Sequence, residues 1–260
     1  MIISYKYKFL FIGLPFSASS AITKELHKEY EGEPYLRKHS LYHEFEKVAT
    51  TEEKKFFVFA VLRNPMEIAV TVYEKMKANS KGNFTNPELF TENGGHISKK
   101  QRERFNFIHD NNASFQEYFI KFFNKPYDNQ ASLTLDKCNY VIRYENITND
   151  YKTALIKAGI ENPKYLPVAN KTAGGKKDLS EYYTKDVQSL ASFVFGPYLK
   201  KYSYQFPKDW IHTKIPSSAK ILFYIVGIIR KWKWKWKLRK YSIRKSIKGS
   251  IYGDMQRKNN

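Results

Sequence analysis

The stretch Tyr7–Leu26, YKFLFIGLPFSASSAITKEL, decides the fold. It begins with a nearly unbroken apolar run from Lys8 to Leu14, which is short enough to form a strand buried on both faces. A proline and three serines follow, and then Ile22 and Leu26 resume the apolar pattern at helical spacing. This order predicts a buried strand, a tight loop and a helix that begins at the second or third serine.

Small residues fill the end of this loop, namely Ser17, Ala18, Ser19 and Ser20. Backbone N–H groups at a helix N-terminus, the positive end of the helix dipole and serine hydroxyls together form a site for a phosphate. A buried strand followed by a helix with a serine cap explains the same residues. The loop lacks the Gly and Lys of the ATP-binding pattern GxxxxGK[ST], so an ordinary ATPase is not expected.

A second apolar run, FFVFAVL from Phe56 to Leu62, ends at Arg63. Because Pro65 suits the first turn of a helix, Arg63 is predicted at the carboxyl end of a central strand, where open α/β sheets bind ligands. A buried guanidinium must be paired. Its partner is either an anionic ligand or a neighbouring carboxylate such as Glu67 or Glu145.

With these two motifs the chain resembles the sulfotransferases that use 3′-phosphoadenosine 5′-phosphosulfate (PAPS). LPFSASSA, residues 14–21, stands where that family has the loop that holds the 5′-phosphosulfate. RNPMEIAVT, residues 63–71, stands where the family supplies an Arg and a Ser to the 3′-phosphate. The resemblance implies that residues 17–20 bind the phosphosulfate, and that Arg63 and Thr71 bind the 3′-phosphate.

Further segments extend the resemblance over residues 7–207. They are YVIRYENITNDYKTALIKAGI (140–160), the NKT of residues 170–172, and YLKKYSYQFP (198–207). The resemblance implies a basic loop over the cofactor, with contacts from Lys171, Lys176 and Lys177, although a solvated loop fits these lysines equally. It also implies the fold: a three-layer, P-loop-like α/β domain with a mainly parallel sheet.

Two positions depart from the family pattern. Phe16 occupies the place of the lysine that neutralises the leaving phosphate, and Ala18 replaces a loop glycine. Another cation is therefore needed if the chain is active, and Lys38 is the candidate because its loop is expected to face the sulfate end of the cofactor.

His39 follows Lys38 at a place where the family often has a Lys-His pair near the acceptor. The resemblance implies that His39 takes the proton of the acceptor hydroxyl. A surface histidine before the helix expected over residues 41–48 is the alternative, and His43 and Glu44 are the next candidates for a base.

Composition sets outer limits on the function. The chain has 260 residues and a net charge of +20, and its single cysteine, Cys138, excludes an internal disulfide and a cysteine metal cluster. No metal is expected. No secretory segment precedes the first strand, so a cytoplasmic protein is expected. Residues 208–260 hold 15 Lys/Arg against 2 Asp/Glu, which is +13, and the preceding residues carry the other +7.

This basic tail, residues 208–260, is predicted as a separate region from a domain over residues 1–207. At 100° per residue one apolar stripe collects Ile221, Ile225, Ile228, Ile229, Trp232, Trp236, Ile243 and Ile247. Lysines flank or oppose it, which is typical of a helix that lies in an anionic membrane surface. A solvated basic tail and a tail that binds nucleic acid remain alternatives, and KWKWKWK also alternates like a strand.

The resemblance implies an enzyme that moves a sulfuryl group from PAPS to a hydroxyl acceptor, most simply a saccharide or another precursor of a surface polymer. Two other functions stay open. One is a small-molecule kinase of the same architecture, against which the missing GK[ST] counts. The other is a non-catalytic descendant of the fold that binds membrane or nucleic acid through its tail, which Phe16 favours.

Overall fold

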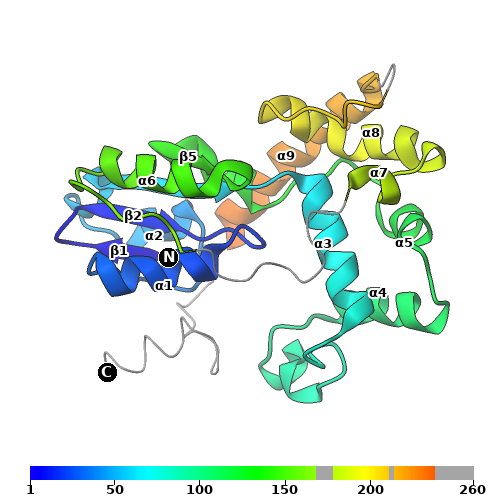
Figure 1. The fold of residues 1–260 in the computed structure, drawn as a ribbon, viewed down its shortest axis with the longest axis horizontal. Coiled ribbons are helices and arrows are strands. Elements are labelled where there is room, and N and C mark those ends of the chain that lie inside the picture. Colours follow the sequence, from blue (N-terminus) through cyan, green and yellow to red (C-terminus); the bar gives the residue numbers. More distant parts are fainter. Residues whose placement is uncertain (168–177, 211–213, 238–260) are drawn as a thin grey trace. The chain divides into compact units, whose positions relative to one another are not determined.

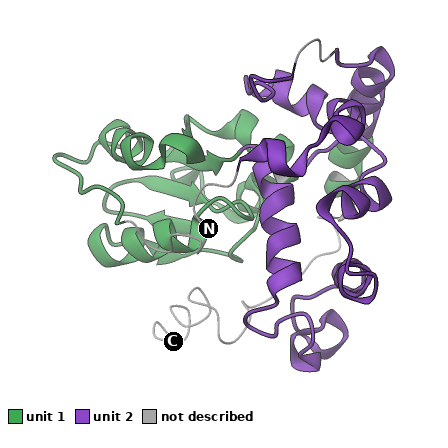
Figure 2. Cartoon of the chain, turned by 45° about the vertical axis from the view of Figure 1, so that its right-hand side comes forward, with its two compact units in different colours: residues 1–63, 129–173, 229–260 green, residues 64–128, 174–228 purple. Residues whose placement is uncertain are grey.

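The computed structural model shows an α/β chain that divides into two compact units (Figures 1 and 2). The residues described are 1–167, 178–210 and 214–237. Unit 1 contains residues 1–63, 129–173 and 229–260, and unit 2 contains residues 64–128 and 174–228. The boundary expected after residue 207 stays a prediction.

Unit 1 is built on a five-stranded mixed sheet with the order β3-β1-β2-β4-β5. Its strands are β1 (Ile2–Ser4), β2 (Phe9–Ile12), β3 (Glu33–Pro34), β4 (Phe57–Leu62) and β5 (Tyr140–Arg143). The strands β2, β4 and β5 are parallel, with Phe11 opposite Phe59 and Ala60 opposite Val141. Because β1 is antiparallel to both β2 and β3, four strands point one way and β1 opposes them. The sheet is therefore mostly parallel.

The antiparallel edge of this sheet was not predicted. The sequence pattern placed the first strand in the run that became β2, because the three residues of β1 are too few to show a period. Residues 35–40 were predicted to contain a short second strand and the loop after it, but the strand β3 lies just before them, at Glu33 and Pro34. Pro34 has no N–H to donate, and an edge strand tolerates this loss.

The core of unit 1 confirms that the central strands are buried on both faces. On one face Phe11 and Phe59 pack with Ile22 of α1 (Ser19–Glu29) and with Tyr151 of α6 (Ile147–Lys157). The residues that alternate with them, such as Leu10 and Ala60, are also fully buried. The helix α2 (Tyr42–Val48) belongs to the same unit.

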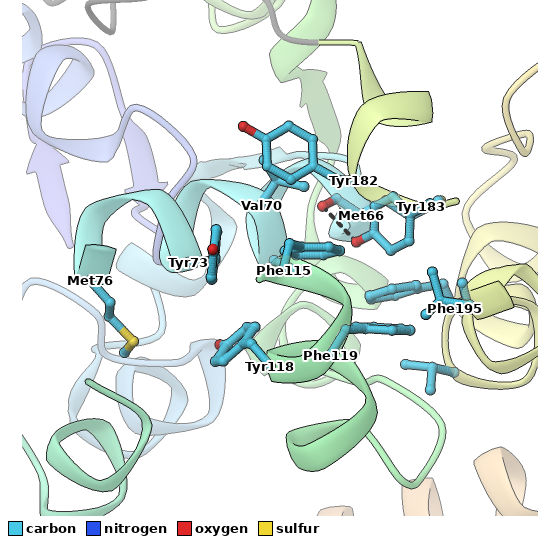
Figure 3. Packing of buried hydrophobic residues seen from close by; sticks show 14 of the residues in the cluster. Met66, Val70, Tyr73, Met76, Phe115, Tyr118, Phe119, Tyr182, Tyr183 and Phe195 are labelled. Atoms are coloured by element: carbon cyan, nitrogen blue, oxygen red, sulfur yellow. Dashed lines mark hydrogen bonds between the residues drawn. The ribbon is translucent and has the colours of Figure 1, made fainter. Parts of the chain in front are cut away.

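Unit 2 is helical and has an aromatic core (Figure 3). Its helices are α3 (Pro65–Ala78), α4 (Lys99–Asp110), α5 (Phe115–Phe122), α7 (Leu179–Tyr182) and α8 (Lys185–Lys201). Phe115 meets Tyr183 edge to face, with ring centroids 4.9 Å apart, and the Tyr183 hydroxyl donates to the Met66 carbonyl at 3.1 Å. Edge-to-face packing satisfies the ring quadrupoles, and the hydrogen bond satisfies the buried hydroxyl.

The helix α9 (Ser217–Lys237) is the last described element. It belongs to unit 2 up to residue 228 and to unit 1 from residue 229. The predicted apolar stripe extended to Ile243 and Ile247, which lie outside the described residues. Short 3-10 turns occur at Glu53–Lys55, Pro87–Leu89, Thr91–Asn93, Gln130–Leu133, Leu135–Lys137 and Tyr144–Asn146.

Candidate functional site

The loop between β2 and α1 has an unusual backbone. Phe16 and Ala18 both adopt left-handed conformations, with φ of 61° and 54°, and Ala18 is the N-cap of α1. Residues with a Cβ rarely adopt this conformation, which costs about 1–2 kcal/mol each. The buried Ser17 hydroxyl donates to the Leu14 carbonyl at 2.7 Å and stabilises the turn between the two strained residues. The helix begins at Ser19, as predicted, because the left-handed Ala18 cannot continue it backwards.

Gly13 brings this loop close to its surroundings. A Cβ at Gly13 would lie 2.9 Å from Ser19 Cβ and 3.4 Å from the Lys38 carbonyl oxygen. Any side chain at residue 13 would therefore push the end of β2 away from the first turn of α1. The glycine places three segments of unit 1 in contact: the end of β2, the start of α1 and the segment before α2.

The backbone amides at the end of the loop form the first turn of α1, which begins at Ser19. Such first-turn amides carry the positive end of the helix dipole. Ser17 differs from its predicted role, because its hydroxyl proton already binds Leu14 inside the loop.

Lys38 supplies a cation to the first turn of α1. Its ammonium group donates to Ser20 Oγ at 2.7 Å. The segment that carries Lys38 is fixed by the Met1 amine, which donates to the carbonyls of Arg37 at 2.9 Å and Lys38 at 3.3 Å. An ion pair between Arg37 and Glu44 ties the same segment to α2. Lys38 is therefore held beside the loop by contacts on both sides of it.

His39 is held neutral with a defined tautomer. Its Nδ1 lies 2.6 Å from the Gly13 carbonyl oxygen. A carbonyl only accepts hydrogen bonds, so Nδ1 carries the proton and Nε2 keeps a lone pair. Burial lowers the pKa of His39 to about 4, and the Gly13 hydrogen bond opposes this only in part. The neutral ring has the form that a general base requires.

Arg63 reaches the same loop from the end of β4. Its Nη1 donates to the Phe16 carbonyl oxygen at 3.3 Å, and its guanidinium lies over the Tyr144 ring, 4.2 Å from the centroid. Tyr144 directly follows β5, so the site collects residues from the carboxyl ends of all three parallel strands. The cation–π contact of Tyr144 was not predicted, although an aromatic residue directly after a buried strand is the signal that would have indicated it.

The remaining predicted site residues are Thr71, the three lysines of the basic loop and the alternative base Glu44. Thr71 is on α3 in unit 2. Lys171, Lys176 and Lys177 fall outside the described residues. The Glu44 carboxylate accepts from the Leu41 amide and pairs with Arg37, which is a structural role.

Three other features bear on what the chain can do: the reactivity of Cys138, the capacity to bind a metal ion, and the apolar character of the helices. Burial raises the pKa of the Cys138 thiol to about 12, so it is not a reactive thiolate. Among the described residues, no three His, Cys, Asp or Glu side chains gather closely enough to hold a metal ion. The helices described include none with both the length and the apolar character needed to cross a bilayer.

No protein-family model, curated protein or solved structure matches this chain.

Proposed function

We propose that unit 1 binds PAPS at the β2–α1 loop and transfers its sulfuryl group to a hydroxyl acceptor, most simply on a saccharide. The observation that carries this proposal is the bond between Lys38 Nζ and Ser20 Oγ, 2.7 Å long. It supplies the cation that the loop lacks at Phe16, and the backbone amides at the N-terminus of α1 lie beside it. A loop with amide donors and a lysine suits a doubly charged phosphosulfate.

Arg63 is the residue that we propose gives the protein its preference for nucleotides with a 3′-phosphate. Its guanidinium is oriented by the Tyr144 ring and by the Phe16 carbonyl, on the same sheet edge as the loop. In the proposed complex Arg63 binds the 3′-phosphate. The three-layer, P-loop-like arrangement of the domain is part of this proposal.

The chemistry assigned to the chain is proton transfer and charge neutralisation. His39 Nε2 accepts the proton of the acceptor hydroxyl as its oxygen attacks sulfur. Lys38 neutralises the phosphate oxygen that leaves when its bond to sulfur breaks. The donor supplies the activated sulfuryl group, and the reaction is mostly a matter of positioning.

The test is nucleotide preference, measured by calorimetry on the unmodified full chain. Adenosine 3′,5′-bisphosphate should bind at least ~10-fold more tightly than AMP or ATP, because one additional charge-assisted hydrogen bond contributes about 1.5–3 kcal/mol. Equal affinity for the bisphosphate and AMP would remove the sulfotransferase proposal. A preference for ATP would support the small-molecule kinase, and failure to bind all three would support the non-catalytic descendant.

A further inference from the structure

One face of α9 exposes a row of large apolar side chains to solvent. Its members are Ile221, Leu222, Tyr224, Ile225, Ile228, Ile229, Trp232 and Trp236. At 100° per residue these positions fall within one broad stripe. We call this set the α9 apolar face. The rings of Trp232 and Trp236 lie side by side, with centroids 5.6 Å apart, so the aromatic end of the face is continuous.

Basic side chains border this face. On the helical wheel Lys231 and Lys233 lie on its two edges, and Arg230 lies opposite. Lys231 and Lys233 are exposed. Lys231 lies 3.8 Å from Asp136, but both side chains are more than half exposed, and such a pair is weak. The lysines can therefore turn toward an anionic surface while their apolar stems extend along the helix.

We infer that the α9 apolar face binds the surface of an anionic membrane, with the helix lying in the plane of the bilayer. An exposed apolar stripe with a lysine on each edge is complementary to acyl chains beneath anionic headgroups. The aliphatic members of the face favour lipid over nucleic acid, since isoleucine has no π-face on which a base can stack. The net charge of +13 over residues 208–260 has the sign that this surface requires. The inference does not depend on the proposed enzyme activity.

The experiment is sedimentation of the full chain with vesicles of phosphatidylcholine, alone and with phosphatidylserine added. A test variant, Ile221→Ser/Ile228→Ser, removes two isoleucines that are 61% and 53% exposed on α9. A matched control, Ile120→Ser/Ile156→Ser, removes two isoleucines that are 56% and 55% exposed on α5 and α6. A charge variant, Lys231→Glu/Lys233→Glu, reverses the sign of the charge on both edges of the α9 apolar face. Equal melting temperatures show that all four proteins are folded.

The unmodified protein and the matched control should bind the serine-containing vesicles equally. The test variant should bind at least ~10-fold more weakly, since two apolar side chains no longer leave water. The charge variant should lose the preference for phosphatidylserine. Vesicle binding that is unchanged in the test variant, or absent in the unmodified protein, overturns the inference. Binding to a single-stranded oligonucleotide but not to vesicles assigns the face to nucleic acid and overturns it as well.

Discussion

The ammonium group of Lys38 lies 2.7 Å from the hydroxyl oxygen of Ser20, so a cation stands at the first turn of α1 although the β2–α1 loop contains no basic residue. The two residues are 18 positions apart in the chain. The contact depends on Gly13, which has no Cβ to separate the Lys38 segment from the helix. A cation in this place makes the loop suitable for an anion that carries more than one charge.

Replacing Lys38 with Ala should weaken the binding of every nucleotide that has a 5′-phosphate. Adenosine 3′,5′-bisphosphate and AMP should each lose about 10- to 100-fold in affinity, as expected when one charge-assisted bond of about 1.5–3 kcal/mol is removed. Calorimetry measures both affinities. The control is Lys47→Ala, which removes an exposed lysine of α2 and should change neither. Unchanged affinities in Lys38→Ala would remove Lys38 from the site.

A second change checks the same assignment. Phe16→Lys places an ammonium at the position where the resembled sulfotransferases have a lysine, in a residue that has a left-handed backbone. It should restore part of the affinity lost in Lys38→Ala and should not lower turnover in the unmodified background. A steep loss of turnover with an intact fold would mean that the loop is built around the aromatic ring and that Phe16 does not correspond to the lysine of the resembled sulfotransferases.

Replacing Arg63 with Ala should weaken binding of the 3′-phosphate and leave binding of the 5′-phosphate unchanged. The bisphosphate should bind about 10- to 100-fold more weakly, whereas the affinity for AMP, which lacks the 3′-phosphate, should barely change. Calorimetry with both nucleotides distinguishes this pattern from that of Lys38→Ala. An equal loss for both nucleotides would show that Arg63 stabilises the loop through Phe16 rather than binding the 3′-phosphate.

Replacing Ala18 with Gly should raise the stability of the protein. Relief of the left-handed conformation is worth about 1–2 kcal/mol, and the extra entropy of glycine in the unfolded chain removes about 0.4–1 kcal/mol of this. The net gain should raise the melting temperature by a few degrees. Ala21→Gly should do the opposite, because Ala21 lies in the right-handed first turn of the same helix, where glycine has no strain to relieve. A lower melting temperature for Ala18→Gly would show that the Ala18 methyl group makes a contact worth more than the strain.

His39 should make the protein less stable in acid. Burial lowers its pKa to about 4 in the folded state, below the ordinary value of 6.5, so the unfolded state binds the proton first. Its contribution is complete above pH 6.5 and is lost as the pH falls toward 4. We expect the free energy of unfolding to fall by about 1–2 kcal/mol. This is less than the full pKa shift of His39 would give, because the ring is only half-buried. Urea unfolding at several pH values should show a shallower slope in His39→Gln than in the control His96→Gln, which changes an exposed histidine. Identical slopes would contradict the assignment.

The features that the sequence predicted are those with a strong local pattern. The strands β2 and β4 lie in apolar runs that are followed by a proline. The start of α1 at Ser19 follows from the small residues before it. The strands β1 and β3 have three and two residues, too few for a period, and they pair only because the rest of the sheet is present.

In the candidate site too, the features with a local sequence pattern were predicted and those that depend on non-local contacts were not. Arg63 and the loop were identified from residues next to them in the chain. The Ser17–Leu14 bond, the Tyr144 ring under Arg63 and the tautomer of His39 depend on which side chains and carbonyls meet in space. Local sequence patterns contain no information about such non-local contacts. Lys38 was selected through the family resemblance, and its bond to Ser20 gives that choice a geometry.

The insertion of residues 64–128 between β4 and β5 has a consequence for assays of this protein. The β5 strand returns to the sheet only after the intervening segment of unit 2 has been traversed, so unit 1 is discontinuous in sequence. A ligand held by the β2–α1 loop and Arg63 therefore binds only a chain whose distant parts have already assembled. At ~100 times its dissociation constant such a ligand adds about 2.7 kcal/mol to the free energy of unfolding. The melting curve of the intact chain thus serves as a ligand screen, whereas a fragment cut at residue 63 lacks the strand that completes the parallel edge.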